Sequence, residues 1–169
     1  MRSVLIALLA AVLLAACDGD TTSTDPRFAT PERTVATLLG SYGLADVSQE
    51  EVRTLMAAHE RFELVDRPSF EACFVEHAEG GPEDALIEGL AGFVVGALAA
   101  GKDELRVEIA GDTAYVSPRA GVRVVLHRQD DGRFLIALRE SVPEDVARRI
   151  ALVAEHAEQR AQRGVAIAQ

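Results

Sequence analysis

The sequence predicts an α+β fold in which N-terminal helices pack on an antiparallel sheet of four strands and a further helix follows at the C-terminus. The apolar period changes from 3.6 to 2 near residue 105 and returns to 3.6 after residue 141. The predicted strands follow one another through short turns, with no helix between them. This order favours a meander over a parallel, doubly wound sheet.

The first helix is predicted to begin after Thr30, whose hydroxyl suits an N-cap, and to end at Gly43. Ser48 and Glu51 have the spacing of a capping box and predict the start of a second helix. A turn at 66–68 leads into a short third helix. Its residues recur at i, i+3, i+4 and i+7: Phe70, Cys73, Phe74 and His77.

The fourth predicted helix runs from Pro82 to Gly101 and contains an uncharged stretch at 89–101. Thirteen residues are too few to cross a bilayer, which takes about 20. The stretch therefore predicts a central helix buried against the sheet. A helix that contacts lipid or lines a ligand site is the alternative.

Alternating apolar residues predict strands at 105–109, 113–117, 121–127 and 134–139. A last helix follows Ser141, with Val146, Ile150 and Val153 on one face. Beyond Ala154 this face consists mostly of alanine, so we expect the helix to fray before Gly164 and residues 164–169 to be disordered.

The composition of the 169 residues limits the function. Arginine and lysine total 17 against 27 acidic residues, and the net charge is −10. Nucleic-acid binding is disfavoured because phosphate contacts need a basic surface. Two cysteines cannot form a disulfide framework, and the absence of tryptophan disfavours a stacking platform for sugars or bases.

The N-terminus has the three parts of a secretory signal peptide: a charged start at Arg2, an apolar run at 4–14, and small residues before Cys17. The tetrad Leu14-Ala15-Ala16-Cys17 resembles the lipobox of bacterial lipoproteins. The resemblance implies that residues 1–16 are removed and that Cys17 carries a diacylglyceryl group and commonly an acylated amine. An ordinary cleaved signal with a chance cysteine is the alternative.

Residues 17–30 are small, polar and acidic and predict a flexible tether between the lipid and the domain. The acyl chains would hold the protein at a membrane, facing the periplasm or the exterior. Asp18 resembles an inner-membrane retention signal of some bacterial lineages, although plain linker composition explains it equally well.

Four stretches of the mature chain, 30–35, 73–74, 105–138 and 141–144, resemble the nuclear-transport-factor-2-like, or cystatin-like, superfamily. The likeness covers most of residues 30–145 and implies that a curved sheet wraps around helices as a cone, within the single domain that we expect at 31–163. That cone hosts isomerases, dehydratases and many non-catalytic binding modules, so the fold does not determine the function. The long C-terminal helix departs from the pattern.

The histidines and cysteines do not predict a catalytic or metal centre. Cys73 and His77 lie four residues apart, as in a thiol–imidazole pair or half of a metal site. Zinc needs three or four ligands, so we interpret Cys73 as a buried apolar residue instead. His59 with Glu63 is predicted to be a surface pair, and His127 and His156 are predicted to be solvated. No cofactor or metal is expected.

We therefore expect a membrane-anchored, non-catalytic binding or envelope-associated module. The rival is a cone enzyme or a carrier of a small apolar ligand, with a pocket lined by Phe70, Phe74, Phe93 and Phe134. A filled core with an exposed apolar patch would favour a protein-binding module. A purely apolar cavity would favour the carrier, and a cavity with a buried titratable residue the enzyme. A homodimer through the last helix is compatible with each.

Overall fold

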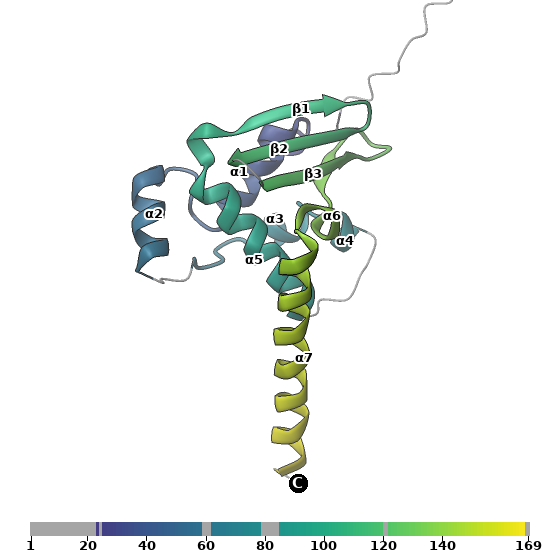
Figure 1. Cartoon of the computed structure of the whole chain (residues 1–169). Helices are drawn as coiled ribbons and strands as arrows, with labels where there is room; N and C mark the ends of the chain where they lie inside the picture. Colours follow the sequence, from purple (N-terminus) through teal and green to yellow (C-terminus); the bar gives the residue numbers. More distant parts are fainter. Residues whose placement is uncertain (1–22, 24, 59–61, 79–84, 120–121, 168–169) are drawn as a thin grey trace, which may run out of the picture.

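Helices and strands follow the predicted order in a computed structural model, which describes residues 23, 25–58, 62–78, 85–119 and 122–167 (Figure 1). The helices are α1 (Pro31–Ser41), α2 (Gln49–Ala57), α3 (Arg67–Glu71), α4 (Val75–Ala78), α5 (Ala85–Ala100), the 3-10 helix η1 (Lys102–Glu104), α6 (Leu138–Ser141) and α7 (Glu144–Ile167). The strands are β1 (Arg106–Ala110), β2 (Thr113–Arg119), β3 (Val122–Arg128) and β4 (Phe134–Ile136). The predicted α+β class is confirmed. The predictions for residues 1–22, including Cys17, and for His59 concern positions outside the described residues.

The sheet is an antiparallel meander in the order β1-β2-β3-β4. Gly111 in the β1–β2 turn and Gly132 in the β3–β4 turn adopt positive φ angles of 61° and 81°, a conformation that glycine reaches without a steric penalty. One face of the sheet is fully buried, at Ala114, Val116, Val124, Leu126 and Ile136. This face packs against α1 and α5.

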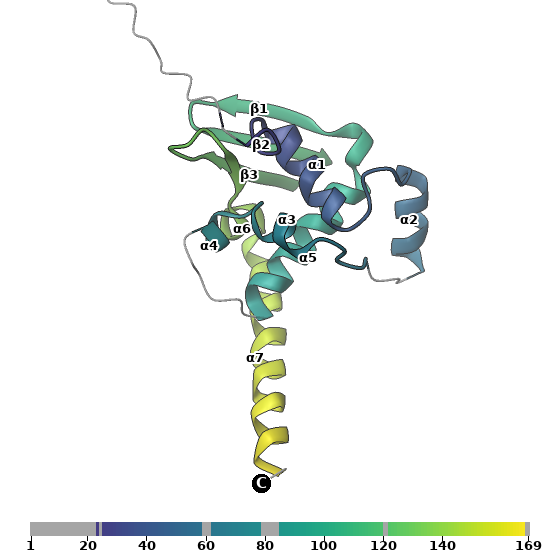
Figure 2. The same cartoon turned by 180° about the vertical axis from the view of Figure 1, so that it is seen from behind.

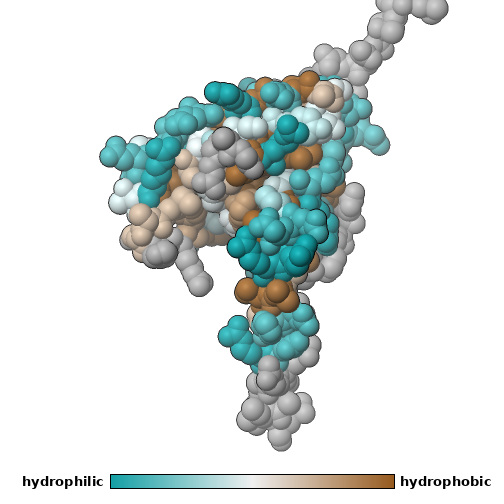
Figure 3. Space-filling model, in the orientation of Figure 1, coloured by the Kyte–Doolittle hydropathy of each residue, from teal (hydrophilic) through white to brown (hydrophobic). Residues whose placement is uncertain are grey.

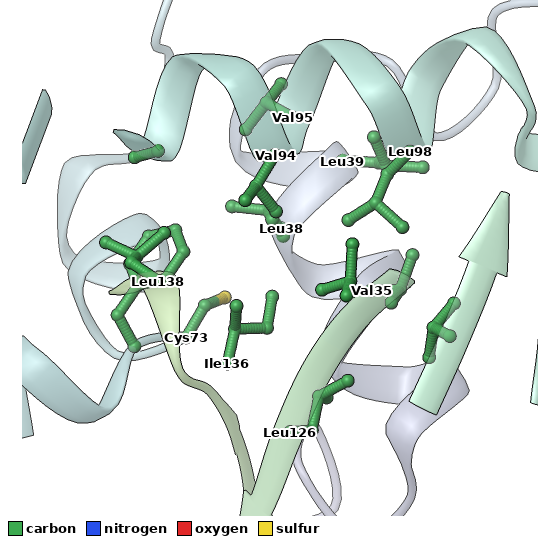
Figure 4. Close-up of a cluster of buried hydrophobic side chains, with 14 of the residues drawn as sticks. Val35, Leu38, Leu39, Cys73, Val94, Val95, Leu98, Leu126, Ile136 and Leu138 are labelled. Atoms are coloured by element: carbon green, nitrogen blue, oxygen red, sulfur yellow. The ribbon is translucent and has the colours of Figure 1, made fainter. Parts of the chain in front are cut away.

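Helix α5 lies in the centre of the core, as the sequence predicted. Val94 and Leu98 from α5 meet Val35 and Leu38 from α1, and all four side chains are at most 2% exposed (Figure 4). The predicted caps are also present. Thr30 accepts a hydrogen bond from the Arg33 amide, and Ser48 accepts one from the Glu51 amide.

The predicted third helix is divided into α3 and α4, which corrects the sequence prediction. Between them Phe74 forms an isolated bridge with Ile136 of β4, and the Ile136 amide donates to the Cys73 carbonyl at 2.8 Å. The chain leaves the helical conformation to extend the edge of the sheet. Cys73 and His77 are consequently not on one helix.

The fourth strand is shorter than predicted because the chain turns into α6 after Ile136. The Ala137 amide still donates to the Val125 carbonyl, at 2.9 Å. The amide of Val125 in β3 donates to a side chain in place of a strand carbonyl: its acceptor is Oγ of Ser141, at 2.9 Å. Because that hydroxyl satisfies the buried amide, the ladder ends without an unpaired donor.

Helix α7 is longer than predicted and continues to Ile167 instead of fraying before Gly164. Its C-terminal part extends away from the rest of the described chain (Figure 1). The reverse view shows that the first described residues lie at the sheet end of the molecule, whereas the C-terminus lies at the opposite end (Figure 2).

Candidate functional site

The candidate site lies along α7, where this helix leaves α5. A methyl group added at Gly89 of α5 would stand only 2.4 Å from Cγ2 of Ile150. Glycine at this position therefore permits the two helices to approach closely. This contact fixes the direction in which α7 departs from the domain.

Two open hollows flank the contact between α5 and α7. The first has a volume of about 340 Å³, and its lining is mainly apolar: Gly89, Val146, Arg149, Ile150, Val153, Ala154 and Ala157. The second has a volume of about 420 Å³ and a more polar rim: Leu86, Leu90, Arg139, Val142, Glu144, Ala147, Arg148 and Ala151. Both hollows open to solvent along the side of α7.

Large apolar side chains on α7 are exposed beside these hollows. Val153 is 65% exposed and Leu152 is 52% exposed. In the space-filling view a hydrophobic band crosses α7 between hydrophilic atoms on either side (Figure 3). Val153 lines the first hollow, whereas Leu152 is the residue before it and therefore faces about 100° away round the helix.

The phenylalanines predicted as a pocket belong to the hydrophobic core or pack against it. Phe74 is fully buried, Phe134 and Phe70 nearly so, and Phe93 packs against the same core. The rings of Phe70 and Phe74 meet edge to face, with centroids 4.9 Å apart. Neither α7 hollow is lined by any of the four.

Cys73 is a buried core residue, as the sequence analysis favoured. Its side chain is 0% exposed, and its sulfur lies beside Ile136 (Figure 4). The thiol donates to the Ser69 carbonyl at 3.1 Å. Desolvation raises the pKa of the thiol from 9.0 to about 12. Because the thiolate is the nucleophilic form, Cys73 is inert near neutral pH.

The raised pKa of Cys73 predicts a loss of stability in alkali. Above pH 9 the thiol ionises in the unfolded chain but stays protonated in the folded chain up to about pH 12, so rising pH favours unfolding. Between pH 7 and pH 10 the wild type should lose about 1.4 kcal/mol more unfolding free energy than Cys73→Ala. Urea titrations at the two pH values measure this difference. Equal losses in both proteins would contradict the prediction.

His77 packs against aromatic rings rather than joining a ligand set. Its ring centroid lies 6.3 Å from that of Phe70 and 6.1 Å from that of Phe74. Within the described ranges, no three histidine, cysteine, aspartate or glutamate side chains are grouped so that they could hold a metal ion. His156 is exposed on α7.

His127 is more constrained than the sequence indicated, because it lies between two polar partners. Its Nε2 is 2.9 Å from Oε1 of Glu140 on α6, and its Nδ1 is 3.4 Å from the hydroxyl of Thr113 on β2. A hydroxyl, an imidazole and a carboxylate are the groups of a nucleophile–base pair with its orienting acid. These three lie outside both α7 hollows and connect α6 to the sheet. We interpret them as a structural link that sequence spacing gave no means to detect.

In comparisons with known proteins, no family model, no curated protein and no solved structure matches this chain. A function is therefore proposed from the geometry and the sequence. Among the helices that the structure describes, none is long and apolar enough to span a membrane.

Proposed function

We propose that this chain is a lipid-anchored bacterial envelope protein whose folded domain is a non-catalytic protein-binding module, with α7 as its docking element. The observation that carries the proposal is the exposed apolar band on α7, with the two hollows beside it. Exposed apolar surface next to shallow grooves is characteristic of sites that bind another protein.

The interior supports a binding module over a carrier or enzyme. The aromatic side chains that a carrier would use belong to the hydrophobic core or pack against it, and the rings of Phe70 and Phe74 contact each other there. The thiol that a nucleophilic enzyme would use is buried and has a raised pKa. The groups that would do chemistry are therefore occupied in holding the fold together.

The lipobox resemblance and the position of the tether support an anchored domain. Cys17 lies six positions before Ser23, and a fully extended chain of this length can span about 20 Å. The first described residues lie at the sheet end, opposite the C-terminus of α7 (Figure 2). An anchor at Cys17 would therefore hold the sheet end near the membrane and direct α7 away from it, toward partners in the adjoining compartment.

Replacement of the lipobox cysteine tests the anchor. In Cys17→Ala we expect complete loss of fatty-acid incorporation and release from the membrane fraction, because the lipid is attached to that sulfur. Metabolic labelling with a fatty-acid analogue and membrane fractionation measure the two effects. Cys73→Ala, which removes the other cysteine, is the matched control and should stay labelled and membrane-bound. Retention of label in Cys17→Ala would refute the lipid anchor.

A photoreactive amino acid tests whether α7 is the docking element. Placed at position 153, beside the first hollow, it should give a discrete protein adduct in intact cells, because a docked partner would cover this side chain. The control is the same amino acid at position 152, which is similarly exposed but faces away from the hollow. Gel electrophoresis detects the adducts. Equal labelling from both positions, or none from 153, would contradict the docking role.

A further inference from the structure

The two edges of the sheet differ, because one of them is closed by another segment of the chain. At the β4 edge Phe74 forms a bridge with Ile136. At the opposite edge β1 pairs with β2 alone among the described strands, and it lies along the border of the domain in both views (Figures 1 and 2). Helix α7 leaves the domain on the side away from β1 (Figure 1). An inference from the β1 edge therefore goes beyond the docking role proposed for α7 and does not depend on it.

The register of the first hairpin shows which backbone groups of β1 point away from β2. Ala110 and Thr113 close a two-residue turn and therefore form a hydrogen-bonded pair. Such pairs alternate along antiparallel strands, so residues 106 and 108 also bond to β2. The amides and carbonyls of Val107 and Ile109 consequently point to the free edge. Leu105 continues the alternation, because its backbone is extended, with angles of −62° and 132°.

The side chains of this edge form an apolar row on one face and a pair of opposite charges on the other. Leu105 and Val107 pack partly against the core, and Ile109 in the same row is 57% exposed. Arg106 and Glu108 are exposed, and neither forms an ion pair with another described residue. Edge strands are commonly protected from pairing by a proline, a bulge or an inward-pointing charge. This stretch has none of the three.

We propose that β1 pairs with β1 of a second copy of this chain, in antiparallel direction and centred on Val107. In this register Val107 lies opposite Val107 of the second copy, Leu105 opposite its Ile109, and Arg106 opposite its Glu108. Two-fold symmetry makes the last two pairs occur twice. Each pair of outward-facing residues exchanges two hydrogen bonds. One sheet then runs through both copies, the exposed Ile109 is covered, and each charge gains an opposite partner.

The charges select this register over its neighbours. Hydrogen bonding requires that outward-facing residues lie opposite one another, so a symmetric pair must be centred on a residue. Moving the centre to Arg106 would place Arg106 opposite itself, and moving it to Glu108 would place Glu108 opposite itself. Like charges in directly opposed positions repel. A second copy centred on Val107 therefore has the charge order that this edge requires.

The expected contact is small, so the association should depend on concentration. It uses five residues of each copy, 105–109, whereas a standard stable interface uses about 20–30 residues a side. Two charged pairs therefore make up a large part of the contact. Reversal of one of these charges should have a measurable effect on dimer formation.

Reversal and exchange of the two charges test the proposal. Arg106→Glu and Glu108→Arg should each weaken self-association of the full chain in detergent by about ten-fold or more, because like charges then oppose each other at two symmetric positions. The matched control carries both substitutions, which exchange the charges and preserve both pairs. It should associate within about two-fold of the parent chain. An equimolar mixture of the two single variants should also associate, as a heterodimer. Sedimentation equilibrium measures the dissociation constants.

A reporter cysteine tests the register directly. At the centre of the pair the two Cα atoms of position 107 would lie about 5.5 Å apart, which a disulfide can bridge. Val107→Cys should therefore give disulfide-linked homodimers on oxidation with copper phenanthroline. Ile109→Cys is the matched control: position 109 is more exposed but lies opposite position 105, so this variant should stay monomeric. Both reporters are placed in full chains that carry Cys17→Ala, where the other thiol, Cys73, is buried.

The two experiments give an ordered set of outcomes. Weakening in both single variants, recovery in the double variant and in the mixture, and crosslinking at 107 but not at 109 would support the pairing. Unchanged association in the single variants, no recovery in the double variant, or crosslinking at 109 as strong as at 107 would overturn it. A parent chain that stays monomeric at the highest concentration reached would also overturn it.

Discussion

Replacing Gly101 with alanine is expected to destabilise the fold by about 3 kcal/mol. Gly101 is buried where α5 passes into η1, with backbone angles of −122° and 21°. An added Cβ would stand 2.1 Å from the carbonyl oxygen of Pro118 and 2.8 Å from its carbonyl carbon. Because these are backbone atoms of β2, no side-chain rotation relieves the clash, and the end of α5 must separate from the sheet.

Gly92 on α5 supplies a matched control. An added Cβ at Gly92 would have no neighbour within 4 Å, and the residue is exposed within the helix. Gly92→Ala should therefore stabilise the protein by about 0.5–1 kcal/mol through helix propensity. Urea unfolding followed by circular dichroism measures both variants. A loss below 1 kcal/mol in Gly101→Ala would show that the contact with Pro118 yields easily, contrary to this account.

Elements defined by their own local pattern could be predicted from the sequence. Thr30 and Ser48 cap helices because a hydroxyl before a helical turn satisfies a free amide in the same turn. Alternation along 121–127 predicted a strand because one face of the sheet is buried there, at Val122, Val124 and Leu126. The uncharged stretch at 89–101 predicted a buried helix because its apolar side chains pack in the core.

Features that depend on distant segments could not be predicted. The division between α3 and α4 arises because Phe74 pairs with Ile136, 62 residues later in the sequence. The early end of β4 depends on Ser141, whose hydroxyl satisfies the Val125 amide in place of a strand carbonyl. Local spacing contains no information about either partner.

The candidate site was predicted only in part. The stripe of Val146, Ile150 and Val153 identified an apolar face on the last helix. Whether this face is buried or exposed to solvent depends on how far α5 packs along α7, which is a property of the tertiary structure. The cleavage before Cys17, the lipid and the resemblance to the nuclear-transport-factor-2-like superfamily stay predictions.

Loss of the ammonium group of Lys102 should have the second large effect on stability. Lys102 is the only lysine in the chain. Its Nζ donates to three carbonyls in the connection between α1 and α2: Leu44 at 3.1 Å, Ala45 at 3.0 Å, and Val47. Next to it, the Asp103 amide donates to the buried side chain of Gln49 at 2.9 Å. Together these bonds hold α2 against the end of α5.

Lys102→Met keeps most of the aliphatic stem but leaves three carbonyls without their charged donor. We expect a loss of about 2–3 kcal/mol, since hydrogen bonds to a charged group contribute more than neutral ones. Arg53→Met is the control at the same junction. Arg53 bonds the Ala100 carbonyl at 3.4 Å and lies 3.5 Å from Glu104, but it is exposed, so its removal should cost less than about 0.5 kcal/mol.

Hydrogen exchange distinguishes loss of this clamp from general destabilisation. In Lys102→Met the amides of α2 should exchange faster at low denaturant, while those of β2 and β3 should change only with global unfolding, because the clamp holds α2 alone. Mass spectrometry of peptic fragments measures both groups. A uniform change across the chain, or an unfolding free energy within 0.5 kcal/mol of wild type, would show that the three carbonyls do not depend on Lys102. Lys102→Arg should recover only part of the loss, because a planar guanidinium cannot direct its donors toward three carbonyls as a compact ammonium does.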